Sequence, residues 1–101
     1  MSLADVKSRI EEKITAAPDF DAVVTFDFGD DGQLTLDATQ SPPELSEGAH
    51  DDPDTTLVCS LETFQKILDG SQDPNIAFMM GKLKVKGSMG TAMKLNGVLE
   101  Q

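Results

Sequence analysis

The 101-residue sequence contains no tryptophan and no tyrosine, and it has a single cysteine and a single histidine. One cysteine cannot form an intramolecular disulfide, which is consistent with a reducing compartment. No apolar run approaches the roughly 18 residues of a membrane span, and the first residues lack the charged and apolar regions of a signal peptide. From these absences we expect one soluble, cytoplasmic domain over residues 1–101, without stable membrane insertion.

Basic residues are also scarce, with eight Lys and Arg against 18 Asp and Glu and a net charge of −10. Residues 1–54 hold fourteen acids and three bases, whereas residues 55–101 hold four acids and five bases. Nucleic-acid affinity comes mainly from neutralising phosphates, so the acidic first half argues against a nucleic-acid partner and against tight docking on anionic membranes. A local basic patch remains, which we interpret as the wet face of an edge strand or as a headgroup site: Lys82, Lys84, Lys86 and Lys94.

The sequence has no Walker motif, no nucleophile elbow and no Rossmann fingerprint. Asp27, Asp30 and Asp31 lack the alternate spacing and distal Glu of a calcium loop. His50 has acidic neighbours but no second His or Cys nearby, and Cys59 has no adjacent basic partner that would activate its thiol. We therefore expect no catalytic residue, no metal site and no cofactor.

The first part of the chain predicts a helix followed by a β-hairpin. Ser2 is a suitable helix start and Pro18 ends the helix, with apolar residues between them at spacings of three and four. Alternation near residues 23–28 and 34–38 predicts two strands around the turn sequence Gly29-Asp-Asp-Gly32. The side chains that we expect to face the interior are Leu3, Val6, Ile10, Ile14, Ala17, Val24, Phe26, Phe28, Leu34, Leu36 and Ala38.

Residues 40–54 are rich in Pro, Asp, Glu and Ser, which predicts a long loop with a short strand near Leu45. Residues 55–60 predict a further strand, and a short helix from Leu61 ends at Gly70. With the elements of the last third, this order predicts an α+β domain: one mostly antiparallel sheet with helices packed on one face.

The last third has the clearest local signals. Pro74 suits a first helical turn that Asp73 can cap, and the apolar run 76–80 is stopped by Gly81. Residues 82–86 alternate Lys with apolar residues, which is typical of a strand with one wet face. After Gly87, Ser88 can cap a final helix with four residues on one side: Met89, Ala92, Met93 and Asn96. We expect a phenylalanine and three methionines of this stretch to point into one interior.

This stretch resembles the closing part of the sterol carrier protein 2 family, the sterol-binding or lipid-transfer domain. The matching residues are Asp69-Gly70, Asp73-Pro74, Ala77-Phe78-Met79, Gly81-Lys82-Leu83-Lys84-Val85, Gly87, Met89-Gly90 and Ala92-Met93-Lys94-Leu95. The strong match covers the last third, and the rest matches in length and element order. The resemblance implies an apolar tunnel between sheet and helices, and the non-enzymatic binding and intracellular transfer of a long apolar lipid: a fatty acid, fatty acyl-CoA, sterol-like molecule or phospholipid.

Methionine is flexible and suits surfaces that repack around varied apolar partners, although filling gaps in a core is the alternative. The residues that we expect to line the tunnel are Phe64, Ile67, Leu68, Phe78, Met79, Leu83, Val85, Met89 and Met93. Lys82, Lys84 or Lys86 would meet a charged headgroup. Two other functions use the same fold: a protein–protein interaction module with a peptide or helix in its groove, and an accessory subunit of a lipid-metabolising enzyme. Transient contact with a membrane or an enzyme fits all three.

Overall fold

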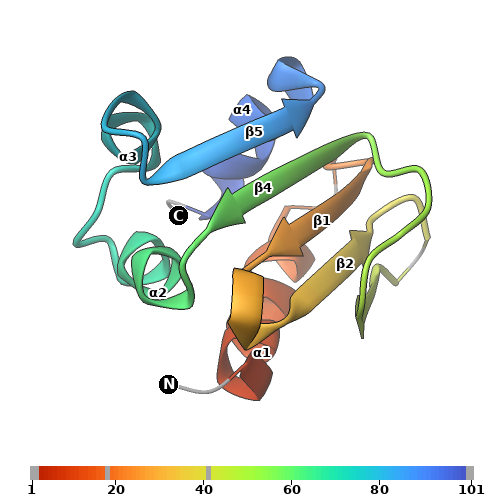
Figure 1. Cartoon of the computed structure of the whole chain (residues 1–101). Helices are drawn as coiled ribbons and strands as arrows, with labels where there is room; N and C mark the ends of the chain where they lie inside the picture. Colours follow the sequence, from red (N-terminus) through yellow and green to blue (C-terminus); the bar gives the residue numbers. More distant parts are fainter. Residues whose placement is uncertain (1–2, 18, 41, 100–101) are drawn as a thin grey trace.

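The computed structural model describes residues 3–17, 19–40 and 42–99 and has one five-stranded sheet with four α-helices (Figure 1). The sheet order is β3-β2-β1-β4-β5; β1 and β4 are parallel, and the other neighbouring strands are antiparallel. The prediction of an α+β fold with one mostly antiparallel sheet is confirmed. The elements are α1 (Leu3–Thr15), β1 (Val23–Asp27), the 3₁₀ turn η1 (Gly29–Asp31), β2 (Gln33–Asp37), β3 (Glu44–Glu47), β4 (Thr55–Cys59), α2 (Leu61–Asp69), α3 (Pro74–Met79), β5 (Leu83–Gly87) and α4 (Met89–Leu99).

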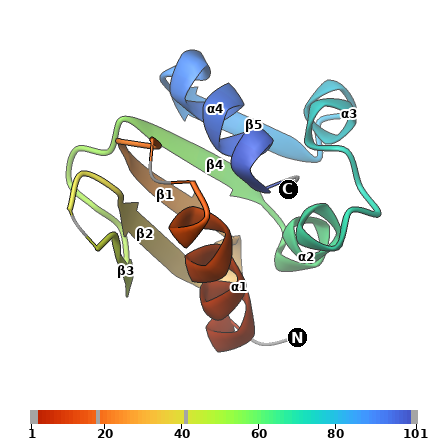
Figure 2. The same cartoon turned by 180° about the vertical axis from the view of Figure 1, so that it is seen from behind.

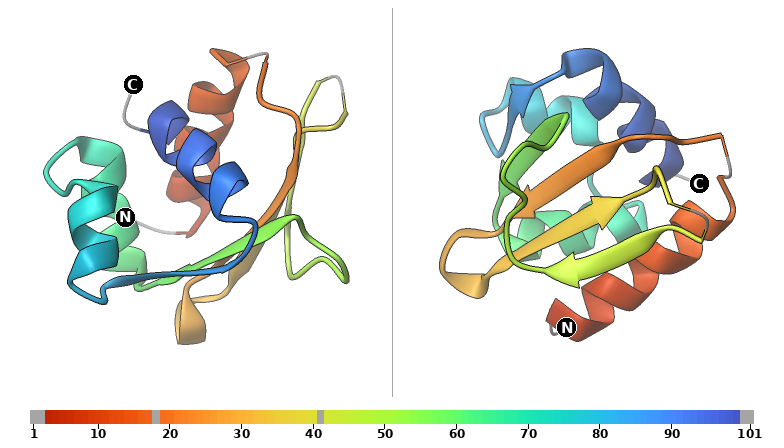
Figure 3. Two further views of the ribbon diagram at one scale, coloured as in Figure 1. Left: turned by 90° about the horizontal axis from the view of Figure 1, so that it is seen from above. Right: turned by 90° about the vertical axis from the view of Figure 1, so that its right-hand side faces the viewer.

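The helices lie on one side of the sheet and leave the other side uncovered. From behind, α1 and α4 cross the sheet, and α2 and α3 lie near the end of β4 and the start of β5 (Figure 2; Figure 3, left). In β5, Leu83 is buried while Lys84 and Lys86 are exposed, so strand alternation places both lysines on the uncovered face. The interpretation of the basic patch as the wet face of an edge strand is therefore confirmed for Lys84 and Lys86. Lys82 precedes the strand, and Lys94 lies in α4, outside the strand.

The core lies between the sheet and the helices, and it contains the predicted interior residues of the first half. Val6, Ile10 and Ile14 of α1 are buried, with Leu3 and Ala17 packed against them. The predicted inner positions of β1 and β2 are buried as well. Three aromatic rings form the centre of the core, with centroids 5.2–6.4 Å apart: Phe26, Phe28 and Phe64. The helix signals at Ser2 and Pro18 lie outside the described residues.

The hairpin between β1 and β2 is confirmed, but its connection differs from a simple turn. Gly29–Asp31 form a single 3₁₀ turn, and Gly32 follows at φ 113°. The Asp27 carboxylate accepts a hydrogen bond from the Gly29 N–H at 2.9 Å. This local bond competes with a tight two-residue turn and explains the longer connection.

The predicted caps at Asp73 and Ser88 and the predicted helix end at Gly70 are confirmed, and α2 has a further cap, Ser60, that the sequence analysis did not name. Ser60 Oγ accepts from the Thr63 N–H at 3.1 Å to cap α2, which ends at Gly70 in the left-handed conformation. Asp73 caps α3 and Ser88 caps α4 in the same way. Residues 40–54 contain the predicted short strand, β3, at Leu45.

Gly87 lies where the end of β5 meets the loop before β4. Its φ is 91°, and a Cβ added there would lie 2.7 Å from the Asp54 carbonyl oxygen and 3.2 Å from the Thr55 Cα. That carbonyl also accepts a hydrogen bond from the Ser88 N–H at 2.9 Å, so it is not free to move away. We predict that Gly87→Ala lowers the free energy of unfolding by about 2–4 kcal/mol, measured by urea denaturation, because backbone strain and a backbone clash add.

Gly81 is the matched control for this substitution. Its φ is also positive, at 77°, but an added Cβ would meet nothing within 4 Å. Gly81→Ala should therefore cost only the backbone strain, about 1–2 kcal/mol. Equal losses of unfolding free energy in the two variants would show that the close backbone approach at Gly87 contributes nothing to the loss.

Candidate functional site

The nine residues predicted to line a tunnel separate into a buried set and an exposed set. Phe64, Ile67, Leu68 and Leu83 are buried, and Val85 is half-buried. In contrast, the exposed fraction is 43% for Phe78, 82% for Met79, 45% for Met89 and 62% for Met93. The expectation that this phenylalanine and the methionines point into the interior is wrong.

The reason lies in which stripe of each helix is buried. α3 has only six residues and buries Pro74 and Ala77, which leaves Phe78 and Met79 on its outer side. In α4 the buried stripe includes Leu95. Met93 precedes Leu95 by two residues, about 200° around the helix, so it faces away from the core. Helical spacing groups residues on a face, but it does not say which face is covered.

The outer sides of α3 and α4 both carry exposed apolar side chains. Among the described residues, the exposed large hydrophobic side chains are Ile76, Phe78, Met79, Met80, Met89 and Met93, which we call the α3–α4 surface. They come from the two elements that precede and follow β5 (Figure 1). Single exposed apolar residues are common on proteins, whereas six on the segments that flank β5 make this surface a candidate binding site.

Asn96 supplies a polar group at the border of this surface. Its Oδ1 is buried and has no hydrogen-bond partner among the described residues. At about 100° per residue, Asn96 lies roughly 20° from Met89 and 60° from Met93 around the α4 axis. An unpaired buried carbonyl costs about 1–3 kcal/mol, and an N–H or O–H donor on a ligand would remove that cost.

A hollow, which we call the α1 groove, lies between the end of α1 and the residues that follow β2. It has a volume of about 530 Å³ and is lined by Ile14, Thr15, Ala17, Asp19, Phe20, Asp21, Ala38, Thr39, Gln40, Pro42 and Pro43. A smaller hollow of about 270 Å³ shares four of these residues and adds Glu11, Leu36 and Leu45. The charged groups in both are carboxylates, which repel an anionic headgroup.

None of the nine predicted lining residues belongs to the α1 groove. The sequence predicts a loop with a short strand for residues 40–54, and Pro42-Pro43 is the available signal of a rigid wall there. All nine predicted lining residues lie instead in α2, α3, β5 and α4.

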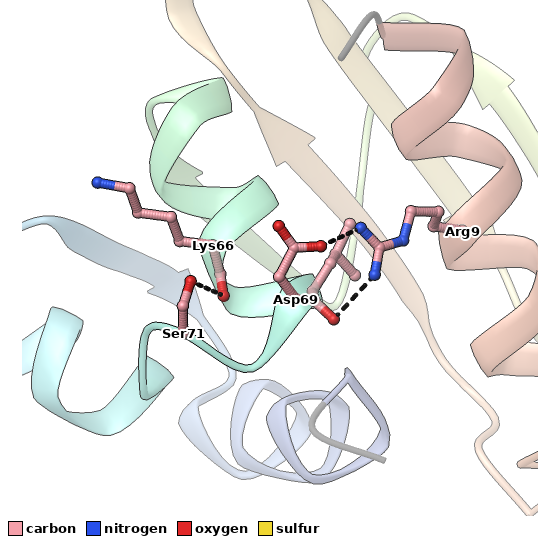
Figure 4. Close-up of polar contacts among 5 residues, drawn as sticks. Arg9, Lys66, Asp69 and Ser71 are labelled. Atoms are coloured by element: carbon pink, nitrogen blue, oxygen red, sulfur yellow. Dashed lines mark hydrogen bonds and ion pairs between the residues drawn. The ribbon is translucent and has the colours of Figure 1, made fainter.

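Arg9 connects α1 to the end of α2. Its guanidinium pairs with the Asp69 carboxylate and donates a second hydrogen bond, at 3.1 Å, to the Leu68 carbonyl (Figure 4). At the same helix end, Ser71 Oγ donates to the Lys66 carbonyl at 3.3 Å. Both charged side chains are partly exposed, so their pairing contributes about 1 kcal/mol at most. Its main effect is to hold the end of α2 against α1, a contact across 60 positions that no local pattern could reveal.

Cys59 lies in the core, and His50 lies in the loop before β4. Cys59 is buried at the end of β4, and burial, followed by the nearby Asp27 carboxylate, raises the pKa of its thiol to about 12. His50 Nδ1 accepts a hydrogen bond from the Asp52 N–H at 3.0 Å, a contact within its own loop.

The raised pKa of Cys59 predicts how its reactivity and the stability of the chain depend on pH. The thiolate is the reactive form, so at pH 8 the folded protein should resist iodoacetamide, while urea-unfolded protein should react fully. Because the pKa is about 9 when unfolded and about 12 when folded, the neutral buried thiol stabilises the fold below pH 9. That contribution should be lost as the pH rises from 9 to 12. The variant Cys59→Ala should lack this alkaline loss, and rapid labelling of the native protein would contradict the burial.

No helix in the described ranges combines the length and the apolar character needed to cross a membrane.

The chain is 33% identical, over 95% of its length, to hydroxysteroid dehydrogenase-like protein 2 of Bos taurus, and it spans only 23% of that protein. Two solved structures from Aedes aegypti share its fold. Sterol carrier protein 2 like 2 has a TM-score of 0.83 at 24% identity, covering 97% of this chain and 96% of the other. Sterol carrier protein 2 in complex with palmitate has a TM-score of 0.79 at 18% identity, covering 98% and 96%. The model of the SCP-2 sterol transfer family matches residues 3–100, and the chain therefore belongs to this family.

Proposed function

We propose that this chain is a single lipid-binding domain that holds one long apolar lipid without chemical change. The observation that carries the proposal is the α3–α4 surface, where Phe78, Met79, Met89 and Met93 stand exposed. The other members of the predicted lining belong to the core or pack against it: Phe64, Ile67, Leu68 and Leu83 are buried, and Val85 is half-buried. Membership of the SCP-2 family and the palmitate-bound structure from Aedes aegypti support this choice.

The energy of binding comes from covering apolar surface. Burial of each methylene group is worth about 0.8 kcal/mol, so a fatty acyl chain gains several kcal/mol from a modest part of its length. Methionine side chains adapt to varied shapes, and an apolar site distinguishes one methylene by only about 1–3 kcal/mol. The proposal therefore includes fatty acids, fatty acyl-CoAs, sterol-like molecules and phospholipids. Among these, a sterol hydroxyl is a donor that would pair with the Asn96 Oδ1.

Two variants decide where the ligand lies. Met93 is exposed, so Met93→Lys should fold normally by circular dichroism. If Met93 contacts the ligand, an ammonium group there should weaken the binding of a fluorescent fatty acid at least tenfold, because the charge would be desolvated. Thr15→Trp is the control: Thr15 is exposed and lines the α1 groove, so the indole would fill that hollow. Weakened binding in Thr15→Trp together with unchanged binding in Met93→Lys would place the ligand in the α1 groove instead.

A second candidate function follows from the curated relatives. They are dehydrogenase-like proteins of which this chain spans less than a quarter, which favours an accessory role beside a lipid-metabolising enzyme. In that role the same site would present a lipid to the enzyme. Native mass spectrometry of the chain purified from its own cells separates the possibilities. A single chain carrying lipid supports the proposal, a stoichiometric complex with such an enzyme supports the accessory role, and a lipid-free complex with another protein supports an interaction module.

A further inference from the structure

The chain crosses one side of the sheet between β3 and β4. These strands are parallel to each other and separated by β2 and β1, so residues 48–54, which we call the β3–β4 loop, run back across both strands. Leu34 and Leu36 are buried in the core, so Thr35 between them points away from the helices. The Thr35 Oγ1 donates a hydrogen bond to the Gly48 carbonyl at 2.7 Å. The loop therefore lies on the side of the sheet that faces the viewer in Figure 1, opposite α1 and α4.

The loop divides this side of the sheet into a covered half and an open half. Thr25 and Thr35 lie opposite each other in β1 and β2, and their exposed fractions are only 3% and 6%, although they face away from the helices. At the far end of the loop, the Asp54 N–H donates to the Val23 carbonyl of β1 at 2.8 Å. The loop thus forms a ridge over β2 and β1. The open half is the outer face of β4 and β5, which we call the β4–β5 floor: Thr56, Val58, Lys84 and Lys86.

The two halves of this face carry opposite charges. Residues 48–54 contain three Asp and no Lys or Arg, whereas the β4–β5 floor contains two Lys and no Asp or Glu. The exposed carboxylates of Asp51 and Asp52 have no ion-pair partner in the described ranges, and the same holds for the ammonium groups of the floor. One face thus presents an acidic ridge beside a basic floor, which makes it electrostatically complementary to a copy of itself.

We propose that two copies of this chain form a dimer through this face, with the ridge of each copy against the β4–β5 floor of the other. A two-fold axis parallel to the strands produces this arrangement, because it lays the β3–β2 side of one sheet over the β4–β5 side of the other. Each contact then occurs twice, as in every isologous interface. A two-fold axis across the strands would instead place Lys84 and Lys86 over their counterparts in the second copy.

The size and charge of the chain limit the strength of this dimer. The net charge of −10 opposes self-association, but the Debye length of about 8 Å is short beside a molecule of 34 × 27 × 26 Å, so acids outside the face are largely screened. Five strands about 4.8 Å apart, each of about five residues, outline a face of roughly 20 × 17 Å, which is less than the about 800 Å² per partner of a standard interface. We therefore expect a weak, reversible dimer. It involves no residue of the α3–α4 surface, so it is independent of the proposed lipid site.

Charge-reversal variants test the dimer by analytical ultracentrifugation. The unmodified chain should change from monomer to dimer as its concentration is raised from micromolar to millimolar. Lys84→Glu/Lys86→Glu and Asp51→Lys/Asp52→Lys should each weaken association at least tenfold, because each places like charges at both contacts. An equimolar mixture of the two variants should restore a one-to-one dimer, since the mixed pair has opposite charges at both contacts. Circular dichroism checks that both variants are folded.

Lys7→Glu/Lys94→Glu is the matched control, because it makes the same charge change on α1 and α4, on the helix side of the sheet. It should leave the dimer intact, and it should form little mixed dimer with Asp51→Lys/Asp52→Lys, since one of the two contacts then stays repulsive. Equal effects of the two lysine variants would overturn the proposal, because net charge alone would then govern association. A monomer at every concentration, or reversal variants that do not dimerise when mixed, would overturn it as well. A dimer that tolerates both reversals and dissociates on Met79→Ser would assign the association to the α3–α4 surface and contradict the proposal too.

Discussion

Palmitate at one hundred times its dissociation constant should raise the melting temperature of this chain by about 10–20 °C. A ligand that binds only the folded state at that concentration adds about 2.7 kcal/mol to the free energy of unfolding. For a domain of this size, each kcal/mol moves the midpoint by roughly 4–8 °C. The measurement is a thermal unfolding scan by circular dichroism, since the chain has no tryptophan or tyrosine for intrinsic fluorescence.

A series of fatty acids gives this prediction an internal control. Each added methylene that is buried should tighten binding by about fourfold, because it contributes about 0.8 kcal/mol. Hexanoate at the same concentration should therefore produce almost no shift. If fatty acids, acyl-CoAs and sterols all shift the midpoint by less than about 1 °C, the lipid-binding proposal fails and the interaction module becomes the better explanation.

Phe64→Ala should remove about 3–5 kcal/mol from the free energy of unfolding, the largest loss that we expect from a single truncation. Phe64 is fully buried, and its ring centroid lies 5.3 Å from that of Phe26 and 5.2 Å from that of Phe28. Truncation both loses apolar burial and leaves a cavity at the contact between α2 and β1. Domains of this kind are stable by only about 5–15 kcal/mol, so this variant should show a clearly lower urea midpoint.

Met79→Ala is the comparison for Phe64→Ala. Met79 is a predicted lining residue as well, but it is exposed, so its truncation should change stability by no more than about 0.5 kcal/mol. Similar losses at the two positions would mean that the α3–α4 surface is covered in solution. The stability loss would then not distinguish the buried Phe64 from the exposed Met79.

Many features of the fold could be predicted because their causes are local. Asp73 and Ser88 cap helices by accepting hydrogen bonds from N–H groups two or three residues away, so both caps could be predicted from the sequence. The alternation in β1 and β2 shows which side chains face the core, because successive side chains point to opposite faces of a strand. The family could be recognised for a related reason: the residues from Asp69 to Leu95 form a dense run of turns, caps and short elements.

The sequence by itself therefore determined the elements, the inner faces of α1, β1 and β2, and the family, because these depend on neighbours along the chain. Only the tertiary structure decided that β1 pairs in parallel with β4, and that Arg9 meets Asp69 sixty positions away. It also decided that Phe78, Met79, Met89 and Met93 lie outside the core. A helix packs whichever stripe meets the sheet and the other helices, and α3 is too short for its own periodicity to select one.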